Sequence, residues 1–506
     1  MAGVRAFREA YMSAELPEGG EFSGYDARQT RYYVLWSLYE NTAYTDVHTW
    51  SQSLRAAHAL YQYTRNLYNP TFRLGEFWST HLMGGVLDPN AGDGSQATTA
   101  LPIVIPEANQ SSEELRKALA LTWRWSNWQS KRELLALWGS ILGDVALQVV
   151  DDVPRKKVYL RVVHPGIIKD LTLDPFGHVK GYVFEEKRMD GAREVVYREE
   201  AERDKERVLY RTFKDNVLFS WDGNGEAAWD EAYGFIPLVF LQHIDVGLDY
   251  GWSEVHAQLS KIREVDELAS MLGDQIRKTV NAIPFFTGTP PNKDGATFTR
   301  SKATTARPQI GREELDALYS SNPAADVKWM VAPIDYEGVL KHVAGLLNDL
   351  EQDYPELRYD RLRATGQVSG ESLKVAREPA EAKVIRRRAR YDDALVRAQQ
   401  MAVAIGGMRG LEGFSGFNLE SYANGLLDHS IGNRPVFAVN PQDELAEAKL
   451  FWETAQLAIK SGLPLISFLK TQGWDETKIA ELQASDEYQA RVAMVKSGLQ
   501  LQGGGG

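Results

Sequence analysis

Two amphipathic stretches on either side of a segment rich in turn-forming residues constrain this chain more than any other feature. From 252 to 282, apolar residues form one stripe at helical spacing while the other face is charged, and Pro284 ends the pattern. A second amphipathic pattern runs from 335 to 354, with Asp335 at the position of an N-terminal cap. Between them, 284–334 has many Pro, Gly and Asp residues and little periodicity. We expect two long helices with a small, irregular α/β module inserted between them.

The part of the chain before these helices changes from helical to strand periodicity. Helical spacing predicts three early helices and then one long helix: 26–44, 50–68, 70–85 and 111–143. A period of two then predicts short strands, which are KVYLRVV (157–163), HVKGYVFEE (178–186), EVVYRE (194–199) and RVLYRTF (207–213). The apolar run 234–241 predicts a further, buried strand. Helices followed by antiparallel strands indicate an α+β fold.

The last third of the chain is predicted to be mostly helical. A loop at 355–370 precedes a helix from about 369 to 405, and Pro379 should kink that helix. Short helices follow, and the chain ends in the flexible glycine tail 503–506.

Length and composition limit the class of protein. With 506 residues, the chain exceeds what one hydrophobic core usually spans, so we expect two or more domains or one elongated subunit. The absence of cysteine excludes disulfides and thiolate metal sites, and the net charge of −12 fits poorly with tight, sequence-independent binding of duplex DNA. That charge still allows a protein that lets DNA pass. The longest apolar run, 235–241, is far shorter than the roughly 20 residues of a spanning helix. We expect a soluble, intracellular protein that does not enter a membrane.

No motif for catalysis stands out. The nine histidines show no metal-binding spacing, and the chain has no phosphate-binding loop, dinucleotide fingerprint or nucleophile elbow. We therefore predict no cofactor, no metal and no enzymatic activity. A metal-dependent nucleic-acid-processing enzyme stays open as an alternative, because its carboxylate ligands could come from distant parts of the sequence.

Five segments carry a resemblance through their order and spacing. They are YNPTFRLGEFWSTHLMGGVL, GDVALQVVDDVPRKKVYLRVVHPGIIKDLTLDPFGHVKGYVFEE, GFIPLVFLQHIDVGLDYGWSEVHAQLSKIREVDELASMLGDQI, TGQVSGESLKVAREPAEAKV and LPLISFLKTQGWDETKIAELQ. In this order they resemble the portal, or head-to-tail connector, protein of tailed double-stranded-DNA bacteriophages, in the long-tailed-phage type. The resemblance covers residues 26 to 485.

The resemblance implies an α+β, elongated portal-type subunit. Its parts would be an N-terminal arm (1–25), a wing of helices and antiparallel strands (26–251), stem helix 1 (252–283), a small α/β clip (284–334), stem helix 2 (335–354), a tunnel loop (355–370), a long kinked helix with a return to the wing (371–440), and a helical crown with a flexible tail (441–506).

The resemblance also implies a function and partners. Portal subunits form a ring, usually of twelve, at one capsid vertex, and double-stranded DNA is packaged and later ejected through its channel. The expected partners are further copies of the chain, DNA, the terminase large subunit, a head-completion adaptor, and the major capsid and scaffolding proteins. The ring would be assembled in the host cytoplasm and kept in the virion. Another virion protein, such as a capsid or adaptor protein, is the remaining alternative, although two helices around a Pro- and Gly-rich module argue against it.

A local excess of positive charge supplies the candidate site residues. From 356 to 390 there are ten basic and five acidic residues, a net of +5 in an acidic chain. If the resemblance holds, the loop residues Arg358, Arg361 and Arg363 are candidates for contact with DNA in the channel, and pairing with Glu356, Asp360 or a neighbouring loop is an equal alternative. A second group wraps around the helix, because neighbouring helical residues are about 100° apart. We interpret this group as candidate inter-subunit contacts rather than a DNA-binding stripe: Arg386, Arg387, Arg388 and Arg390.

Overall fold

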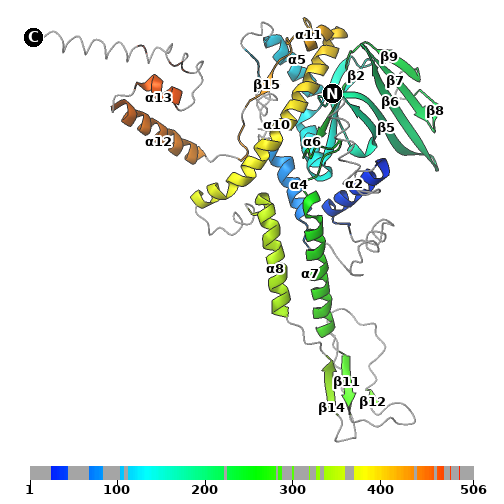
Figure 1. The fold of residues 1–506 in the computed structure, drawn as a ribbon, viewed down its shortest axis with the longest axis vertical. Coiled ribbons are helices and arrows are strands. Elements are labelled where there is room, and N and C mark those ends of the chain that lie inside the picture. The colour runs from blue at the N-terminus through cyan, green and yellow to red at the C-terminus, as the bar shows by residue number, and fades with distance from the viewer. Residues whose placement is uncertain are drawn as a thin grey trace, which may run out of the picture. The chain divides into compact units, whose positions relative to one another are not determined.

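The protein is described by a computed structural model, which divides into two compact units, 1–436 and 437–506. Figure 1 shows its helices and strands. The described residues are 24–43, 68–83, 103–106, 112–220, 225–280, 283–287, 299–300, 318–319, 326–330, 336–358, 370–432, 434–437, 441–460, 464–471, 479, 482 and 489. The predicted helix 50–68 lies almost entirely outside them.

Two early helices confirm the periodicity of the N-terminal part. They are α2 (Tyr25–Tyr39) and α4 (Pro70–His81), and both pack against α6, described next. Helix α4 begins as its sequence predicts: Pro70 occupies the first turn, and the Asn69 side chain accepts a hydrogen bond from the backbone N–H of Phe72.

The long helix predicted for 111–143 is wrong, because the chain forms two helices there. These are α5 (Ser112–Trp125) and α6 (Trp128–Leu142), separated by Asn127 in a left-handed conformation with φ of 49°. Asn tolerates this conformation better than most residues. The Ser126 hydroxyl, next to the break, accepts a hydrogen bond from the backbone N–H of Leu160 in the strand 157–163. A tertiary contact therefore compensates for the interruption of the helix.

A three-stranded antiparallel sheet forms the centre of the first unit. Its order is β10–β2–β3, with β2 (Asp144–Asp152), β3 (Lys157–Val163) and β10 (Leu238–Gln242). The first six residues of β2 are all buried, as expected for a central strand, and α5, α6 and α10 pack against the sheet. The buried strand predicted for 234–241 is confirmed, although it begins at Leu238.

A second antiparallel sheet contains the other predicted strands. Its order is β4–β5–β6–β7–β8, and β9 also pairs with β7. The strands are β4 (Ile168–Leu173), β5 (Val179–Asp190), β6 (Arg193–Asp204), β7 (Arg207–Lys214), β8 (Val217–Leu218) and β9 (Ala228–Glu231). Helices and antiparallel sheets together confirm the α+β class (Figure 1).

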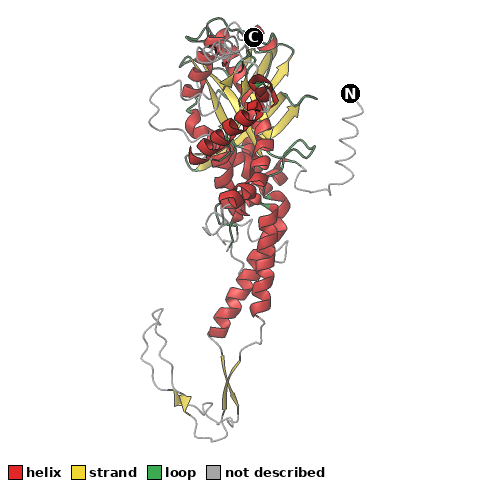
Figure 2. Ribbon diagram, turned by 90° about the vertical axis from the view of Figure 1, so that its left-hand side faces the viewer, coloured by secondary structure: helices red, strands yellow, loops and turns green. Residues whose placement is uncertain are grey.

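The two amphipathic stretches form a pair of antiparallel helices. Helix α7 (Leu259–Val280) and helix α8 (Tyr336–Asp353) lie side by side (Figure 2), and Lys261 near the start of α7 forms an ion pair with Asp353 at the end of α8. The expected start of the first helix at 252 is wrong. Residues 252–255 form a loop held by backbone bonds between Trp252 and Ile244, and a single 3₁₀ turn, η3 (His256–Gln258), leads into α7.

The segment between these helices contributes two small strand pairs. Strand β11 (Ile283–Thr287) pairs with β14 (Asp326–Met330), and β12 (Thr299–Arg300) pairs with β13 (Leu318–Tyr319). Because β11 follows α7 and β14 precedes α8 in the chain, the first strand pair joins the two helices through the inserted segment.

The longest helix is α10 (Gly370–Met408), which continues through Pro379. After it come α11 (Leu419–Ala423) and β15 (Ser430–Ile431), which pairs with β1 (Ile103–Val104). In the second unit, α12 (Pro441–Lys460) and α13 (Leu465–Thr471) enclose a small apolar cluster that includes Ala455, Phe468, Leu469 and Ile479.

Candidate functional site: a buried ionic junction

A cluster of buried charges lies where the helix pair meets α10. Glu254 precedes α7, Glu356 follows α8, and α10 supplies Lys383 and Arg387. Residues four apart in a helix share one face, so both cations of α10 point to the same side. We call this cluster, together with His243, the ionic junction. It ties the start of α7 and the end of α8, which lie at the same end of the helix pair, to α10.

Lys383 is the centre of the junction. Its ammonium group lies 2.8 Å from a carboxylate oxygen of Glu254 and 2.7 Å from one of Glu356. Arg387 donates from Nε to the other oxygen of Glu254 at 2.9 Å. Glu254 is 5% exposed and Glu356 is fully buried. Two acids and two bases therefore balance in charge inside the protein, which is what a buried ionic cluster requires.

His243 extends the junction to a tyrosine of α10. Its Nε2 lies 2.9 Å from Glu254, and its Nδ1 lies 2.8 Å from the hydroxyl of Tyr391. An ionised carboxylate only accepts hydrogen bonds, so Nε2–H donates to Glu254 and Nδ1 accepts from the tyrosine O–H. Burial lowers the pKa of His243 and raises the pKa of Tyr391, which favours a neutral imidazole and a protonated phenol.

The two carboxylates of the junction differ in their electrostatics. Burial by itself would raise the pKa of Glu254, but Lys383, His243 and Arg387 together hold that pKa well below its ordinary value. Burial raises the pKa of Glu356. The positive charge of Lys383 lowers that pKa but does not offset the effect of burial, because the negative charge of Glu254 also disfavours ionisation. Burial works against the charge of Lys383, yet both carboxylates raise its pKa above the ordinary value. The charged forms of Lys383 and Glu254 are thus favoured, whereas Glu356 is the member of the junction whose charged form is disfavoured.

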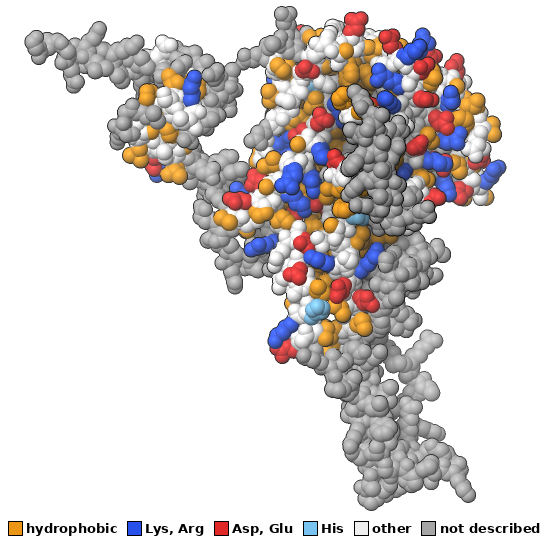
Figure 3. Space-filling view, viewed as in Figure 1, with side chains coloured by type: hydrophobic (Ala, Val, Ile, Leu, Met, Phe, Trp, Pro, Cys, Tyr) orange, Lys and Arg blue, Asp and Glu red, His pale blue; other side chains and the backbone are white. Residues whose placement is uncertain are grey.

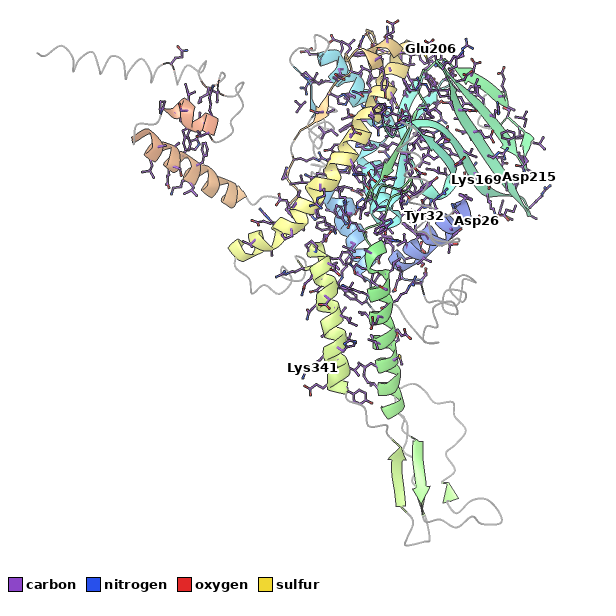
Figure 4. All side chains as sticks on the ribbon, viewed as in Figure 1. Asp26, Tyr32, Lys169, Glu206, Asp215 and Lys341 are labelled. Carbon is purple, nitrogen blue, oxygen red and sulfur yellow. The ribbon has the colours of Figure 1, made fainter. Side chains whose placement is uncertain are left out.

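A third buried carboxylate, Asp144, fixes the loop that carries Glu254. Asp144, at the start of β2, accepts hydrogen bonds from Arg31 and Tyr32 of α2 and from the backbone N–H of Gly251. Burial raises the pKa of Asp144 to about 6 although Arg31 and Gly251 oppose the shift. Figure 4 labels Tyr32 on α2 close to strands of the first unit. Through Asp144, the 251–255 loop is held at a fixed place between α2 and the central sheet.

The four arginines predicted to contact other subunits have different environments. Arg388 is 5% exposed, and its guanidinium donates to the backbone oxygens of His81, Leu82, Arg434 and Pro435. Arg387 belongs to the ionic junction, and the exposed Arg390 pairs with Asp245 of the same chain at 3.2 Å. Arg386 is exposed. Three of the four, Arg387, Arg388 and Arg390, thus have partners within the chain, and the inter-subunit role stays a prediction for all four.

The loop expected for 355–370 is wrong for its first four residues. Residues 355–358 are helical, Glu356 and Leu357 are buried, and Lys383 of α10 forms an ion pair with Glu356. Arg358 is exposed. Glu356, expected as a possible partner of Arg358, pairs with Lys383 instead. Arg361 and Arg363 lie outside the described residues, so the predicted contact with DNA stays a prediction for all three arginines.

Sequence reasoning missed the junction itself. Glu254, His243 and Lys383 stand in segments whose pattern predicted only a strand, a loop and a helix. The spacing of Lys383 and Arg387 on one helix face was the single available signal, and it does not identify their acidic partners.

Among the described residues, no group of three or more His, Asp or Glu side chains is placed to share a metal ion. In the same part of the chain, no helix is long and apolar enough to cross a membrane.

A comparison with known protein families finds no family that matches this chain, and a comparison with curated proteins finds no significant match.

Proposed function

We propose that this chain is the subunit of a portal ring, a channel at one capsid vertex through which double-stranded DNA is packaged and later ejected. The observation that carries the proposal is the antiparallel pair α7 and α8, which is joined through a small β module at one end and tied to the long helix α10 at the other. This is the order of stem, clip and long helix that the resemblance implies. The role is structural and needs no catalytic group.

Exposed apolar side chains support assembly with further copies of the chain. Met271 and Ile276 on α7 are 42% and 46% exposed, and Leu340 on α8 is 56% exposed. On α10, Val375 and Ile385 are also exposed. Large apolar residues left at the surface of a helix pair are suited to a protein interface. In a ring, each subunit would cover such residues on its neighbour through a head-to-tail contact.

The charge distribution is compatible with DNA that passes without binding. On the face seen in Figure 3, acidic and basic side chains are interspersed over the first unit. Tight, sequence-independent binding requires clustered Lys and Arg that neutralise phosphates. The chain is acidic overall, with a net charge of −12, so a ring of such subunits would repel phosphates wherever its acidic residues face the channel.

The terminase large subunit, an adaptor, and the capsid and scaffolding proteins would bind the outer surfaces of the ring.

Native mass spectrometry of the purified chain, with negative-stain images, tests the proposal. The expected result is a particle of about twelve times the 56.8 kDa chain mass, with a central hole in end views. A ring of eleven or thirteen subunits would support it as well. A monomer or dimer at high concentration, in the presence and absence of scaffolding protein, would contradict it. Metal-dependent cleavage of DNA by that monomer would instead favour the nucleic-acid-processing enzyme.

A further inference from the structure

The carboxylate of Glu356 is incompletely satisfied for a buried charged group. The side chain is fully buried, and its only ion-pair partner in the described chain is Lys383, which contacts Oε1. Among the described residues, Oε2 has no hydrogen-bond partner. A buried polar atom without a partner costs free energy, and more so when it carries charge. The closed position of Glu356 is therefore energetically unfavourable when the group is ionised.

The ion-pair partner of Glu356, Lys383, also forms an ion pair with Glu254. Lys383 also contacts Glu254, which receives Arg387 and His243 in addition. The negative charge of Glu254 faces Glu356 across the same ammonium group. For this reason the pKa of Glu356 is raised, first by burial and then by Glu254, despite Lys383.

Glu356 lies on a short helical turn that follows α8 and is not part of α7. Residues 354–358 follow α8, and Arg358 is already exposed at the end of the turn. Tyr354 donates from its hydroxyl to the backbone oxygen of Glu254, while Leu357 is buried. Glu254, in contrast, keeps Arg387 and His243 as partners whether or not Glu356 is present. Loss of the contact between Glu356 and Lys383 would therefore leave the attachment of α7 in place.

We propose that the turn 354–358 is a latch on α10, which is closed while Glu356 lies against Lys383 and opens when the ionised carboxylate leaves for solvent. Protonation of Glu356 removes its charge and favours the closed latch; ionisation favours the open one. The titratable and charged groups that face it are Tyr354 of its own turn, Lys383 of α10 and Glu254 before α7. Arg387 and His243 act on Glu254. The proposal concerns a single chain and does not depend on the formation of a ring.

Hydrogen–deuterium exchange of the full chain, read by mass spectrometry, tests the latch. The test variant is Glu356→Gln, which keeps the shape of the side chain and removes its charge. At neutral pH we expect the protection of amides in 354–358 to rise roughly tenfold, which corresponds to about 1.4 kcal/mol. Protection in 259–280 should not change. In the unmodified chain, the same turn should become better protected at mildly acidic pH after correction for intrinsic exchange rates, and this pH dependence should be lost in Glu356→Gln.

A neighbouring carboxylate provides the matched control. Asp353, three residues earlier, is partly exposed and pairs with Lys261, so Asp353→Asn should not increase protection of the turn. Unchanged or lower protection in Glu356→Gln would overturn the proposal. An equal gain in all peptides would also overturn it, because it would show a global change in stability. If Glu356→Gln failed to fold, the proposal would be wrong as well, since the charge would then be required for closure.

Discussion

At the scale of single residues, the chain depends on a few buried ionisable groups whose partners are far apart in the sequence. Lys383 serves two carboxylates, and Arg387 binds a glutamate 133 residues away. Pairs of this kind contribute little net stability compared with apolar packing, but removal of one member leaves the others buried and unpaired. The effect of a substitution therefore depends on which member is removed.

Lys383→Met should be strongly destabilising. It leaves Glu254 and Glu356 buried next to each other without their shared cation, and we expect a loss of about 3–5 kcal/mol in the free energy of unfolding. Chemical denaturation measures this loss. Lys341→Met is the matched control, because Lys341 is exposed on α8 and points away from α7 (Figure 4). It should change the free energy of unfolding by less than about 0.5 kcal/mol. Equal effects of the two variants would contradict the proposed role of the ionic junction.

His164 should make the protein less stable at acidic pH. Burial lowers the pKa of His164 to about 4, whereas an unfolded chain has a histidine pKa of about 6.5. Because the unfolded state binds the proton first, stability is retained above about pH 6.5 and lost as pH falls towards 4; near pH 5 the loss is about 2 kcal/mol.

His164→Asn should remove that part of the pH dependence. The ring accepts a hydrogen bond from the backbone of Gly166, and an asparagine oxygen at the same place can replace this acceptor. The free energy of unfolding, measured from neutral to acidic pH, should therefore fall less steeply than in the unmodified chain. His178→Asn, at an exposed histidine, should leave the slope unchanged. An unchanged slope in His164→Asn would show that the residue does not titrate as described.

At the scale of elements, the ends of helices and strands depend on contacts that local patterns do not reveal. Asn127 divides what periodicity predicts as one helix, and Pro379 does not end α10. Gly143 ends α6 and begins the turn into β2 with φ of +92°. A Cβ atom there would lie 2.6 Å from the backbone nitrogen of Ser253, so this turn and the loop that carries Glu254 require a glycine.

Two glycine-to-alanine substitutions should have opposite effects. Gly143→Ala should lower the free energy of unfolding by at least about 2 kcal/mol, because it combines a strained φ with a backbone clash. Gly273 lies in the interior of α7, and a methyl group added there would meet no atom within 4 Å. Gly273→Ala should therefore raise the free energy of unfolding by up to about 1 kcal/mol. Thermal or chemical unfolding of both variants is the measurement. A stabilising Gly143→Ala would mean that the loop at Ser253 is not held as described.

At the scale of the whole molecule, the proposed ring requires surfaces that the single chain leaves uncovered. Leu340 on α8 is exposed, and so are Met271 and Ile276 on α7. The net charge of −12 makes separate chains repel one another, so apolar contacts of this kind would have to offset that repulsion on assembly.

Leu340→Glu should disrupt assembly without unfolding the chain. A substitution at an exposed site should change the free energy of unfolding of the monomer by less than about 0.5 kcal/mol. In a ring, the new carboxylate would be buried against a neighbour, so the fraction of rings in native mass spectra should fall. Lys341→Gln, at the adjacent exposed residue, should assemble normally. Normal assembly of Leu340→Glu would show that α8 does not take part in subunit contacts.

The class of fold and many of its elements could be predicted from the amino-acid sequence. Alternation with a period of two located β3, β5, β6 and β7, and helical spacing located α7, α8 and most of α10. Each of these signals depends on which residues a single element buries. Which charged side chains meet, in contrast, depends on the tertiary structure. Ion pairs such as Lys383 with Glu254 join residues from different elements, and their stability depends on burial and on shared partners that no local pattern encodes. For the same reason Arg388, which looks in the sequence like one of several surface cations, is held inside the chain by backbone oxygens.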